Sequence, residues 1–291
     1  MTLMKTALVI VLLLALALAA LVAFGRWRWD GLTQDVFARL EAARAEHKTI
    51  TFDARELDGL PPVVQRYFRT VLRDGAPIVA AVSVDHAGHF NMGETTDRWI
   101  PFTSRQRVVT QRPGFVWDGD MRLLPGLSMR VHDAYVAGEG LLRPSLLGAF
   151  TLMELRGGGD VAQGELMRFF AEAAWYPTAL LPSQGVQWTA VDDRSAKATM
   201  SDGPLTLTLS FAFTEDGLME SVRAEARGRT ESGQIVMRPW EGRWFDFQES
   251  GGMRVPMRGE VAWLLPAELG GRKPYWRGMI TSLRYELASR P

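Results

Sequence analysis

Apolar and polar side chains alternate along most of the chain from Pro77 onward, and this period of two is typical of β-strands. The clearest segment is Leu205–Thr214, in which one face carries Leu205, Leu207, Leu209, Phe211 and Phe213. Turn sequences bracket it, Ser201-Asp202-Gly203 before and Glu215-Asp216-Gly217 after. We predict a strand here and, from the same pattern elsewhere, roughly ten to twelve strands in series.

Short, turn-like connections separate these segments, so neighbouring strands should pair antiparallel as a meander. The predicted strands include residues 78–90, 97–102, 105–111, 115–123, 129–136, 196–200, 205–214, 222–226, 253–265 and 279–287. So many twisted strands cannot stay flat. The sequence therefore predicts a mainly β fold: a long antiparallel meander curved into a half-barrel or open barrel, with one internal amphipathic helix.

That helix is predicted at 161–175, within the segment Glu165–Ser183. Its apolar side chains recur at helical spacing and form a stripe of Leu166, Phe169, Phe170 and Ala173. The charged side chains lie off this stripe, at Glu165, Arg168 and Glu172. Asp160 is suited to cap the start, with Gln163 completing a capping box, and Pro177 ends the helix. We expect the stripe to pack against the concave face of the sheet.

The N-terminal region begins with an uninterrupted apolar run, Ala7–Phe24, which as a helix is about 27 Å long and long enough to cross a hydrocarbon core. A cleaved signal peptide is the alternative, because Ala17-Leu18-Ala19 offers a cleavage site. The flanking Arg26-Trp27-Arg28-Trp29 is typical of a membrane–water boundary and favours a retained single-pass anchor. Flanking charges do not fix the orientation, but the signal-like layout favours an extracytoplasmic body.

Two shorter helices are predicted after the anchor. Residues 31–48 form one apolar stripe and are expected to be a solvated stalk that packs lightly on the body, rather than a coiled coil, because the pattern covers barely two heptads. Pro62–Leu72 begins after Pro61 and stops before Asp74-Gly75, with an apolar face that must dock. The predicted organisation is an anchor at 1–30, a stalk and docking helix at 31–75, and a curved β domain at 76–291.

Composition excludes several functions. The chain has 33 basic and 33 acidic residues, so no net field attracts nucleic acid. It has no cysteine, which excludes disulfides, thiolate nucleophiles and cysteine-based metal sites, as well as a lipoprotein attachment residue.

Catalytic patterns are also scarce. His86 and His89 are three apart in a predicted strand and therefore point to opposite faces, while His47 and His132 have no obvious companions. The Gly157-Gly158-Gly159 run lacks the spacing of a phosphate-binding loop, and no G-x-S-x-G motif is present. We expect no catalytic residue, no metal site and no cofactor.

Carboxylates offer the remaining route to general acid–base chemistry. Glu139, Glu165 and Glu241 each lie among apolar or glycine neighbours, and a pair of them in one cleft could support glycoside-type hydrolysis. The alternative, which we favour, is that they cap turns or pair with arginines such as Arg143 and Arg243.

Tryptophan is abundant, with ten residues against roughly four at average usage. Most should be core residues, because a large aromatic side chain buries about 150–250 Å². If the curved sheet encloses a cavity, the same residues would line an apolar pocket with Trp175-Tyr176-Pro177 at its rim. The candidate ligand-binding residues are Glu165, Trp175, Tyr176, Trp240, Glu241 and Trp263.

Several long motifs resemble a bacterial family of uncharacterised proteins with an N-terminal anchor and one β-rich domain. They are PPVVQRYFRTVL, FVWDGDMRL, GELMRFFAEAAWYPTALLPS, WTAVDDRSAKATMSDG, PWEGR and PYWRGMIT. The resemblance spans nearly the whole chain and implies no known activity. More distantly, the expected architecture is similar to the half-barrel of lipoprotein-localisation carriers, a likeness of fold that does not fix function.

The sequence thus favours a non-enzymatic protein of the bacterial inner membrane, single-pass, with its main domain extracytoplasmic. It is expected to contact the membrane through residues 7–24 and to bind a lipid or another apolar small molecule, with no nucleic-acid partner. Two alternatives stay open: a carboxylate-dependent hydrolase acting in the same cavity, and a scaffold for another envelope protein, with the protein partner unknown.

Overall fold

The computed structural model describes residues 2–46, 48–94, 96–231 and 234–289. Its helices are α1 (Thr2–Ala42), α2 (Pro62–Val71) and α3 (Gly159–Ala171), with short 3-10 helices η1 (Ala54–Leu57), η2 (Glu172–Trp175), η3 (Pro177–Leu180), η4 (Pro182–Gln184) and η5 (Ala267–Leu269). The strands before α3 are β1 (Val79–Asn91), β2 (Trp99–Val109), β3 (Gly114–Leu124), β4 (Leu127–Val136), β5 (Glu139–Leu146), β6 (Phe150–Thr151) and β7 (Leu155–Gly157). Those after it are β8 (Gln187–Ala190), β9 (Ser195–Asp202), β10 (Leu205–Phe213), β11 (Met219–Glu231), β12 (Gln234–Ser250), β13 (Met253–Leu264) and β14 (Arg272–Leu287).

All described strand pairs are antiparallel and form one sheet of two meanders. The order is β6-β5-β4-β3-β2-β1-β14-β13-β12-β11-β10-β9-β8, and β7 lies off this path and pairs with β5. The first strand of one meander therefore pairs with the last strand of the other. The predicted fold class is therefore confirmed, with 14 strands in place of the ten to twelve expected. One predicted break is wrong: Thr103-Ser104 continues β2, because Ser104 lies on the buried face and keeps the alternation.

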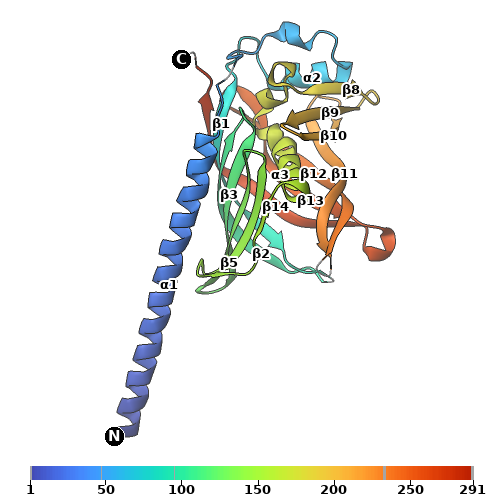
Figure 1. Cartoon of the computed structure of the whole chain (residues 1–291). Helices are drawn as coiled ribbons and strands as arrows, with labels where there is room; N and C mark the ends of the chain where they lie inside the picture. Colours follow the sequence, from blue (N-terminus) through green and yellow to red (C-terminus); the bar gives the residue numbers. More distant parts are fainter. Residues whose placement is uncertain (1, 47, 95, 232–233, 290–291) are drawn as a thin grey trace.

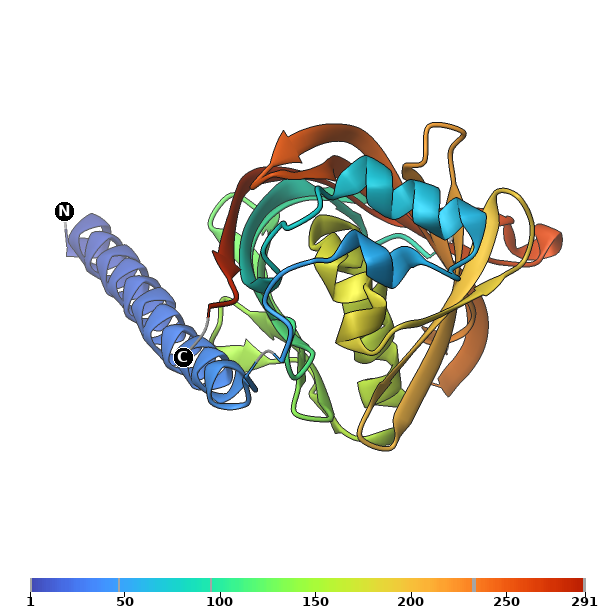
Figure 2. The same ribbon diagram turned by 90° about the horizontal axis from the view of Figure 1, so that it is seen from above.

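The sheet is strongly curved and open, and its concave face holds α3 (Figures 1 and 2). Helix α3 contacts β4 and β5 in the first meander and β10 and β11 in the second. It therefore spans the gap between the two halves of the open barrel. The predicted docking helix is confirmed as α2, and its apolar residues are buried at one end of the concave face, where they contact β9 and β13.

Helix α3 differs from its prediction in two ways. It starts from Gly158 without a side-chain cap, so Asp160 lies in the first turn, and after Ala171 the chain continues as 3-10 turns to Gln184. Its predicted apolar stripe is buried, but the charged side chains are enclosed as well: Glu165 is 8% exposed, and the side chains of Arg168 and Glu172 are 15% and 12% exposed. A helix in the gap of an open barrel has protein on nearly every side, so its polar face is enclosed too.

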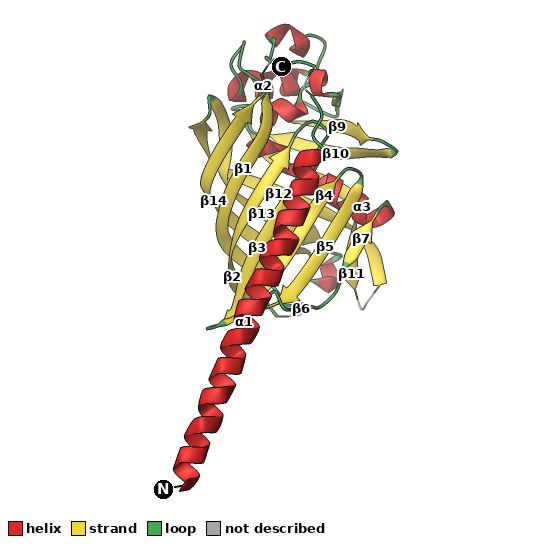
Figure 3. Cartoon of the chain, turned by 60° about the vertical axis from the view of Figure 1, so that its left-hand side comes forward, coloured by secondary structure: helices red, strands yellow, loops and turns green. Residues whose placement is uncertain are grey.

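Helix α1 passes residue 30 without a break, and its second half lies against the convex face of the sheet (Figure 3). Val36 and Leu40 pack there in a second hydrophobic cluster with Ala81, Val109, Val116, Ala134, Val136 and Leu141. Gly25 permits the close approach, because a Cβ at this position would lie 2.3 Å from the carbonyl oxygen of Leu147. The stalk at residues 31–48 was predicted to pack lightly on the body in contact with solvent, but its contact with the sheet is buried.

Trp29 completes this contact. Its ring is fully buried and stacks on His132 at 3.9 Å between centroids, and its Nε1 donates to Asp118 Oδ1 at 2.9 Å. Of the two tryptophans expected at the membrane boundary, Trp29 therefore belongs to the protein core, whereas Trp27 is 73% exposed. The preceding stretch of α1 is long and apolar enough to cross a membrane, with a mean hydropathy of 3.2 and none of it buried.

Candidate functional site

Tryptophans on the concave face lie flat on glycines of the sheet. Trp117, Trp240 and Trp276 are each followed two positions later by a glycine on the same face of the strand. A Cβ on Gly119 would lie 2.2 Å from the Trp117 ring, and a Cβ on Gly278 would lie 2.4 Å from the Trp276 ring. These glycines leave room for the indole rings to fold back over the strands.

Ring contacts join these tryptophans to η2. Trp175 packs against Trp244 at 5.2 Å and against His86 at 4.9 Å, and His86 packs against Trp276 at 6.0 Å. Within the described part of the chain, four buried nitrogens of this group have no hydrogen-bond partner: His86 Nε2 and the Nε1 atoms of Trp117, Trp175 and Trp244. Other buried polar atoms without a described partner lie on the convex face, among them His132 Nδ1 and Arg130 Nε. The four nitrogens of this group differ in being surrounded by aromatic rings, which makes the concave interior a candidate site.

His86 is neutral in this environment. Burial lowers the pKa of His86 to about 3, and the charge of Arg168 contributes in the same direction. Its Nδ1 lies 3.2 Å from Ser104 Oγ. The ring therefore serves as a neutral, partly unpaired polar group among aromatic side chains.

A buried charge cluster of Asp133, Glu165, Arg168 and Glu172 lies next to these rings. Arg168 pairs with Asp133, and its Nε donates to Glu172 Oε1 at 2.7 Å. The Arg168 guanidinium also lies 5.2 Å from the centroid of Trp117. Burial opposes ionisation of Arg168, but the carboxylates of Glu172 and Asp133 outweigh it and raise its pKa.

Glu165 makes no ion pair or hydrogen bond with an arginine among the described residues, although the charges of Arg227 and Arg168 favour its ionised form. Burial raises the pKa of Glu165 well above its ordinary value, and the neighbouring carboxylate of Asp133 raises it further. Glu165 Oε2 and Asp133 Oδ1 are both buried without a hydrogen-bond partner among the described residues. In this pair Glu165 holds its proton more tightly than a free carboxyl group does, which is a property of general acids.

Nearer the ends of β1, β13 and β14 the concave face carries an inner aromatic patch, which comprises Phe90, Trp240, Trp263 and Tyr275. Tyr275 is central: it stacks on Trp263 at 5.8 Å, packs against Phe90 at 5.5 Å and accepts a hydrogen bond from Trp240 Nε1 at 2.9 Å. Phe90, Trp263 and Tyr275 are only partly buried. The patch is therefore an apolar surface that the fold leaves partly accessible.

Two arginines of β11 border the inner aromatic patch. Arg229 lies 5.9 Å from the Trp263 centroid and is paired with Glu231 at 2.8 Å. Arg227 lies 4.9 Å from the Trp240 centroid, and it makes no ion pair or hydrogen bond with any described residue. Its charge acts on the Glu165 carboxyl group, but none of its N–H groups is bonded to a described residue. A partly buried guanidinium with free donors next to an apolar surface is suited to a polar or anionic end of an amphipathic molecule.

The structure separates the six residues proposed from the sequence. Trp240 and Trp263 lie together in the inner aromatic patch, and Glu165 belongs to the buried charge cluster. Trp175 and Tyr176 are 2% and 0% exposed and lie in the packed interior, not at an opening. Glu241 lies on the opposite face of the sheet, where it pairs with Arg243 at 2.8 Å and Arg272 at 2.6 Å. Glu165 and Glu241 therefore do not share a cleft.

The remaining candidates bring no further chemistry. His86 points into the concave interior, whereas His89 is on the exposed face, as strand geometry requires. His132 lies under Trp29, and His47 is outside the described residues. Within the described ranges no cluster of three histidine or carboxylate side chains could hold a metal ion.

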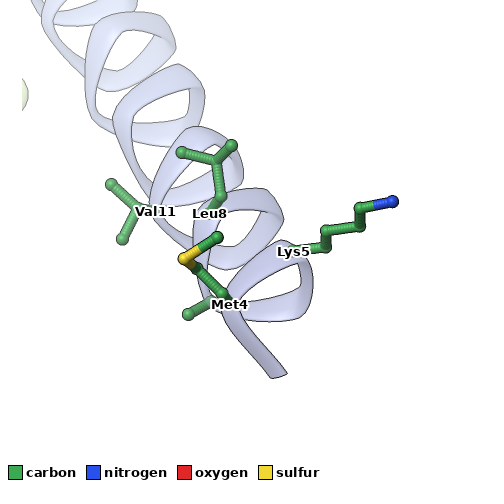
Figure 4. Close-up of a pocket in the computed structure, with 5 residues that line it drawn as sticks. Met4, Lys5, Leu8 and Val11 are labelled. Atoms are coloured by element: carbon green, nitrogen blue, oxygen red, sulfur yellow. The ribbon is translucent and has the colours of Figure 1, made fainter. Parts of the chain in front are cut away.

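Two surface hollows lie away from the concave face. One, of about 570 Å³, is lined by α1 and by Arg143 and Arg156 of the first meander. The other, of about 460 Å³, follows the apolar part of α1, where Met4, Leu8 and Val11 project to one side (Figure 4).

The tryptophan–glycine arrangement was missed in the sequence reading, although its signal is present there. Trp-x-Gly occurs at Trp117, Trp240 and Trp276, in three different strands, and a fourth copy, Trp29-Asp30-Gly31, lies in α1. Because i and i+2 share a face of a strand, this spacing alone places an indole beside a bare stretch of backbone. Arg227 carries no comparable signal, because its place beside Trp240 depends on the fold.

Comparison with known proteins adds a family. The model of a family of unknown function (DUF6920) matches residues 58–285, which confirms the resemblance noted from the sequence. No curated protein matches the chain.

Two solved structures are similar in part. A LolA superfamily protein from Nitrosomonas europaea aligns with a TM-score of 0.37 and 10% identity, over 79% of this chain and 93% of that protein. A β-barrel-like protein of a domain of unknown function (DUF1849) from Brucella abortus aligns with a TM-score of 0.15 and 10% identity, over 72% and 98% of the two chains.

Proposed function

This chain belongs to the DUF6920 family of unknown function, and we propose that it is a membrane-tethered envelope protein that binds an apolar or amphipathic, lipid-like ligand on its concave face. The ligand would lie on the inner aromatic patch with a polar end at Arg227. The protein would be located in the bacterial inner membrane, as a single-pass protein whose main domain is extracytoplasmic.

The tether is supported by the two halves of α1. The first half is wholly exposed and strongly apolar, and the second half is bound to the sheet through Gly25, Trp29, Val36 and Leu40. A helix that is apolar on all sides and unburied is stable in a bilayer and costly in water. Arg26 and Trp27, both exposed, follow directly and suit a headgroup layer.

The inner aromatic patch is the observation that carries the ligand proposal. Partly exposed aromatic rings on a concave surface gain free energy when an apolar molecule removes them from water, about 25 cal/mol for each Å² of apolar area. Arg227 adds one unpaired donor group at the edge of the patch. An apolar surface with a few placed polar groups is the usual composition of a small-molecule site.

A second candidate function rests on the carboxyl pair. Glu165 with Asp133, and not Glu165 with Glu241, would supply an acid and a base for hydrolysis. Its test is turnover of chromogenic glycosides and esters by the full chain, with Glu165→Gln as the matched variant. Equal turnover in both proteins would remove this candidate.

The ligand proposal is tested by native mass spectrometry of the full chain released from detergent micelles. We expect one apolar molecule per protein, retained by Trp99→Ala and lost from Trp263→Ala. Trp99 is the matched control, because it is also partly buried but lies on the outer face under Arg277. Absence of any bound molecule from the wild type, or equal retention in both variants, would contradict the proposal.

A further inference from the structure

Exposed apolar side chains of the β domain gather at one end of the sheet. The rim, as we name it, comprises the residues Met92, Leu124, Phe150, Leu152, Met153, Ile235, Met237 and Leu269, which are between 40% and 63% exposed. Outside α1 only four other large apolar residues of the described chain are exposed: Val191, Phe245, Met279 and Leu287. Most of the exposed apolar surface therefore belongs to the rim, and such a concentration marks an interaction surface.

The rim lies at the strand ends where α1 leaves the domain. Leu124 ends β3, and Leu147 N donates to Ser128 O in the next strand, which places the β3–β4 and β5–β6 turns side by side. Gly25 of α1 packs against Leu147 and Ala149. The last residues of β1, β11 and β13, which are Asn91, Glu231 and Leu264, lie at the same end, because the pairing is antiparallel throughout. Figure 1 shows α1 continuing past this end of the sheet.

A polar contact fixes the nearest part of the rim to α1. Arg28 donates to Gly148 O at 2.9 Å and to Thr151 Oγ1 at 3.0 Å, so the segment that carries Phe150 and Leu152 is held against the helix. Trp27 and Arg26 directly precede Arg28 in α1, and both are exposed. The rim and the expected headgroup layer therefore occupy the same level along α1.

We propose that the rim lies in the interfacial layer of the same bilayer that α1 spans, so that the β domain rests on the membrane with its concave face open toward it. This inference rests on the proposed tether. The apolar run of α1 and the rim then form one continuous membrane-contacting surface, and the occupant of the rim is lipid. Exposed leucine, phenylalanine and methionine side chains gain by entering the acyl boundary.

The position of the inner aromatic patch gives the inference a functional meaning. Phe90 is one residue from the end of β1, and Trp263 is one residue from the end of β13. Tyr275 is near the start of β14, which begins at Arg272. The patch therefore adjoins the rim. A lipid-like molecule could pass between the bilayer and the patch without crossing water.

Depth-dependent fluorescence quenching tests the proposal. The chain has no cysteine, so single substitutions give unique labelling sites. The full chain carrying Leu14→Cys, Leu124→Cys, Phe150→Cys or Val191→Cys is labelled with an environment-sensitive nitrobenzoxadiazole probe. Each protein is reconstituted into vesicles of phosphatidylethanolamine and phosphatidylglycerol that contain one of two nitroxide lipids. One is labelled near its glycerol backbone, for positions 124, 150 and 191, and the other is labelled deep in an acyl chain, for position 14. Val191 is the matched control, because it is 53% exposed, as Phe150 is, but lies in the turn after β8 at the opposite end.

We expect quenching at positions 124 and 150 to exceed that at position 191 by about twofold or more. Quenching at position 14 with equal, low quenching at 124, 150 and 191 would overturn the inference and leave the tether intact. Equal, strong quenching at 124, 150 and 191 would overturn it too. Absence of quenching at position 14 would contradict the tether itself, and the inference with it.

Discussion

Two helices pack on opposite faces of one sheet, and they do so in different ways. On the convex face α1 presents Trp29, Val36 and Leu40 to small apolar residues, and the buried indole N–H of Trp29 is satisfied by Asp118. On the concave face α3 presents charged side chains beside tryptophans, and polar atoms of both groups have no partner within the described residues.

This difference suggests that the convex face attaches α1 to the β domain and that the concave face binds another molecule. The contact of α1 combines apolar side chains with the paired N–H of Trp29. Buried polar atoms without a described partner occur here too, at His132 Nδ1 and Arg130 Nε, so such atoms do not by themselves distinguish the two faces. The surroundings of α3 differ in holding a buried carboxyl group with a raised pKa and a partly exposed aromatic patch, which cost folding free energy unless another molecule or water meets them. We therefore read the convex face as structural and the concave face as functional.

The largest expected effect is on the convex face. Trp29→Ala removes a fully buried ring together with its hydrogen bond, and should lower the free energy of unfolding by about 3–5 kcal/mol. Trp27→Ala, two positions away and 73% exposed, should change it by less than about 0.5 kcal/mol. Urea unfolding of the full chain in one detergent measures both. Similar values for the two variants would mean that α1 is not docked.

Lowering the pH should reduce the free energy of unfolding mainly through His86 on the concave face. Because the pKa of buried His86 is lowered to about 3 from 6.5, the folded state resists a proton that the unfolded state accepts. The resulting stability is complete above pH 6.5 and is lost as the pH falls toward 3, by about 1.4 kcal/mol for each pH unit.

His86→Gln should remove that part of the slope of unfolding free energy against pH, and His89→Gln, at an exposed position, is the control. His132 on the convex face, whose pKa burial lowers to about 4, should contribute a slope that ends at higher pH. An unchanged slope in His86→Gln would show that the concave interior is hydrated.

Raising the pH should lower the free energy of unfolding through the carboxyl pair of Glu165 and Asp133. Burial raises the pKa of Glu165 above 4.5, so the folded state keeps a proton that the unfolded state releases. Stability from this group is full below pH 4.5 and falls as the pH rises through the folded pKa. Glu165→Gln should therefore raise the free energy of unfolding at neutral pH and flatten its decline.

Glu172→Gln provides the contrast, because Glu172 accepts from Arg168 at 2.7 Å and from Gln106 Nε2 at 2.6 Å. Its loss should destabilise the protein by about 3–5 kcal/mol, since it leaves buried partners unpaired. If Glu165→Gln destabilised the protein at neutral pH as Glu172→Gln does, Glu165 would be an ion-paired carboxylate.

The smallest expected effect on stability is the difference between a tryptophan whose indole N–H is hydrogen-bonded and one whose N–H is not. Trp240→Phe removes a donor to Tyr275 and should cost about 1 kcal/mol more than Trp244→Phe, whose indole N–H has no partner among the described residues. Thermal unfolding of the two proteins provides the comparison. A larger cost for Trp244→Phe would show that its N–H is satisfied in the intact protein.

The strands and the apolar stripes were predictable because local periodicity encodes them. The alternation at Leu205–Thr214 and the stripe of Leu166, Phe169 and Phe170 are both buried as expected. Trp240 and Trp263 are among the candidate site residues predicted from the sequence. The Trp-x-Gly spacing could also have predicted the tryptophans that lie on glycines of the concave face. These features depend on positions two to four residues apart.

The remaining features depend on contacts that are distant in the sequence. Asp133 meets Glu165 and Arg168 only because α3 enters the gap of the barrel, and this enclosure buries a helix face that looks polar in isolation. Trp29 resembles a membrane-boundary residue until Asp118, 89 positions away, accepts its N–H. Glu241, like Glu165, has apolar neighbours in the sequence. It nevertheless points to the convex face, because it alternates with Trp240, which points to the concave face.

The most direct test of the account is contact between an apolar ligand and the concave tryptophans. In the full chain carrying Trp27→Phe, which removes the fluorophore at the expected bilayer boundary, tryptophan fluorescence is titrated with dibromostearic acid in nanodiscs of unbrominated lipid. We predict saturable quenching at about one equivalent, reduced by about half or more in Trp263→Ala and unchanged in Trp99→Ala. Quenching that rises linearly without saturation, or that is the same in all three proteins, would contradict a ligand site on the concave face.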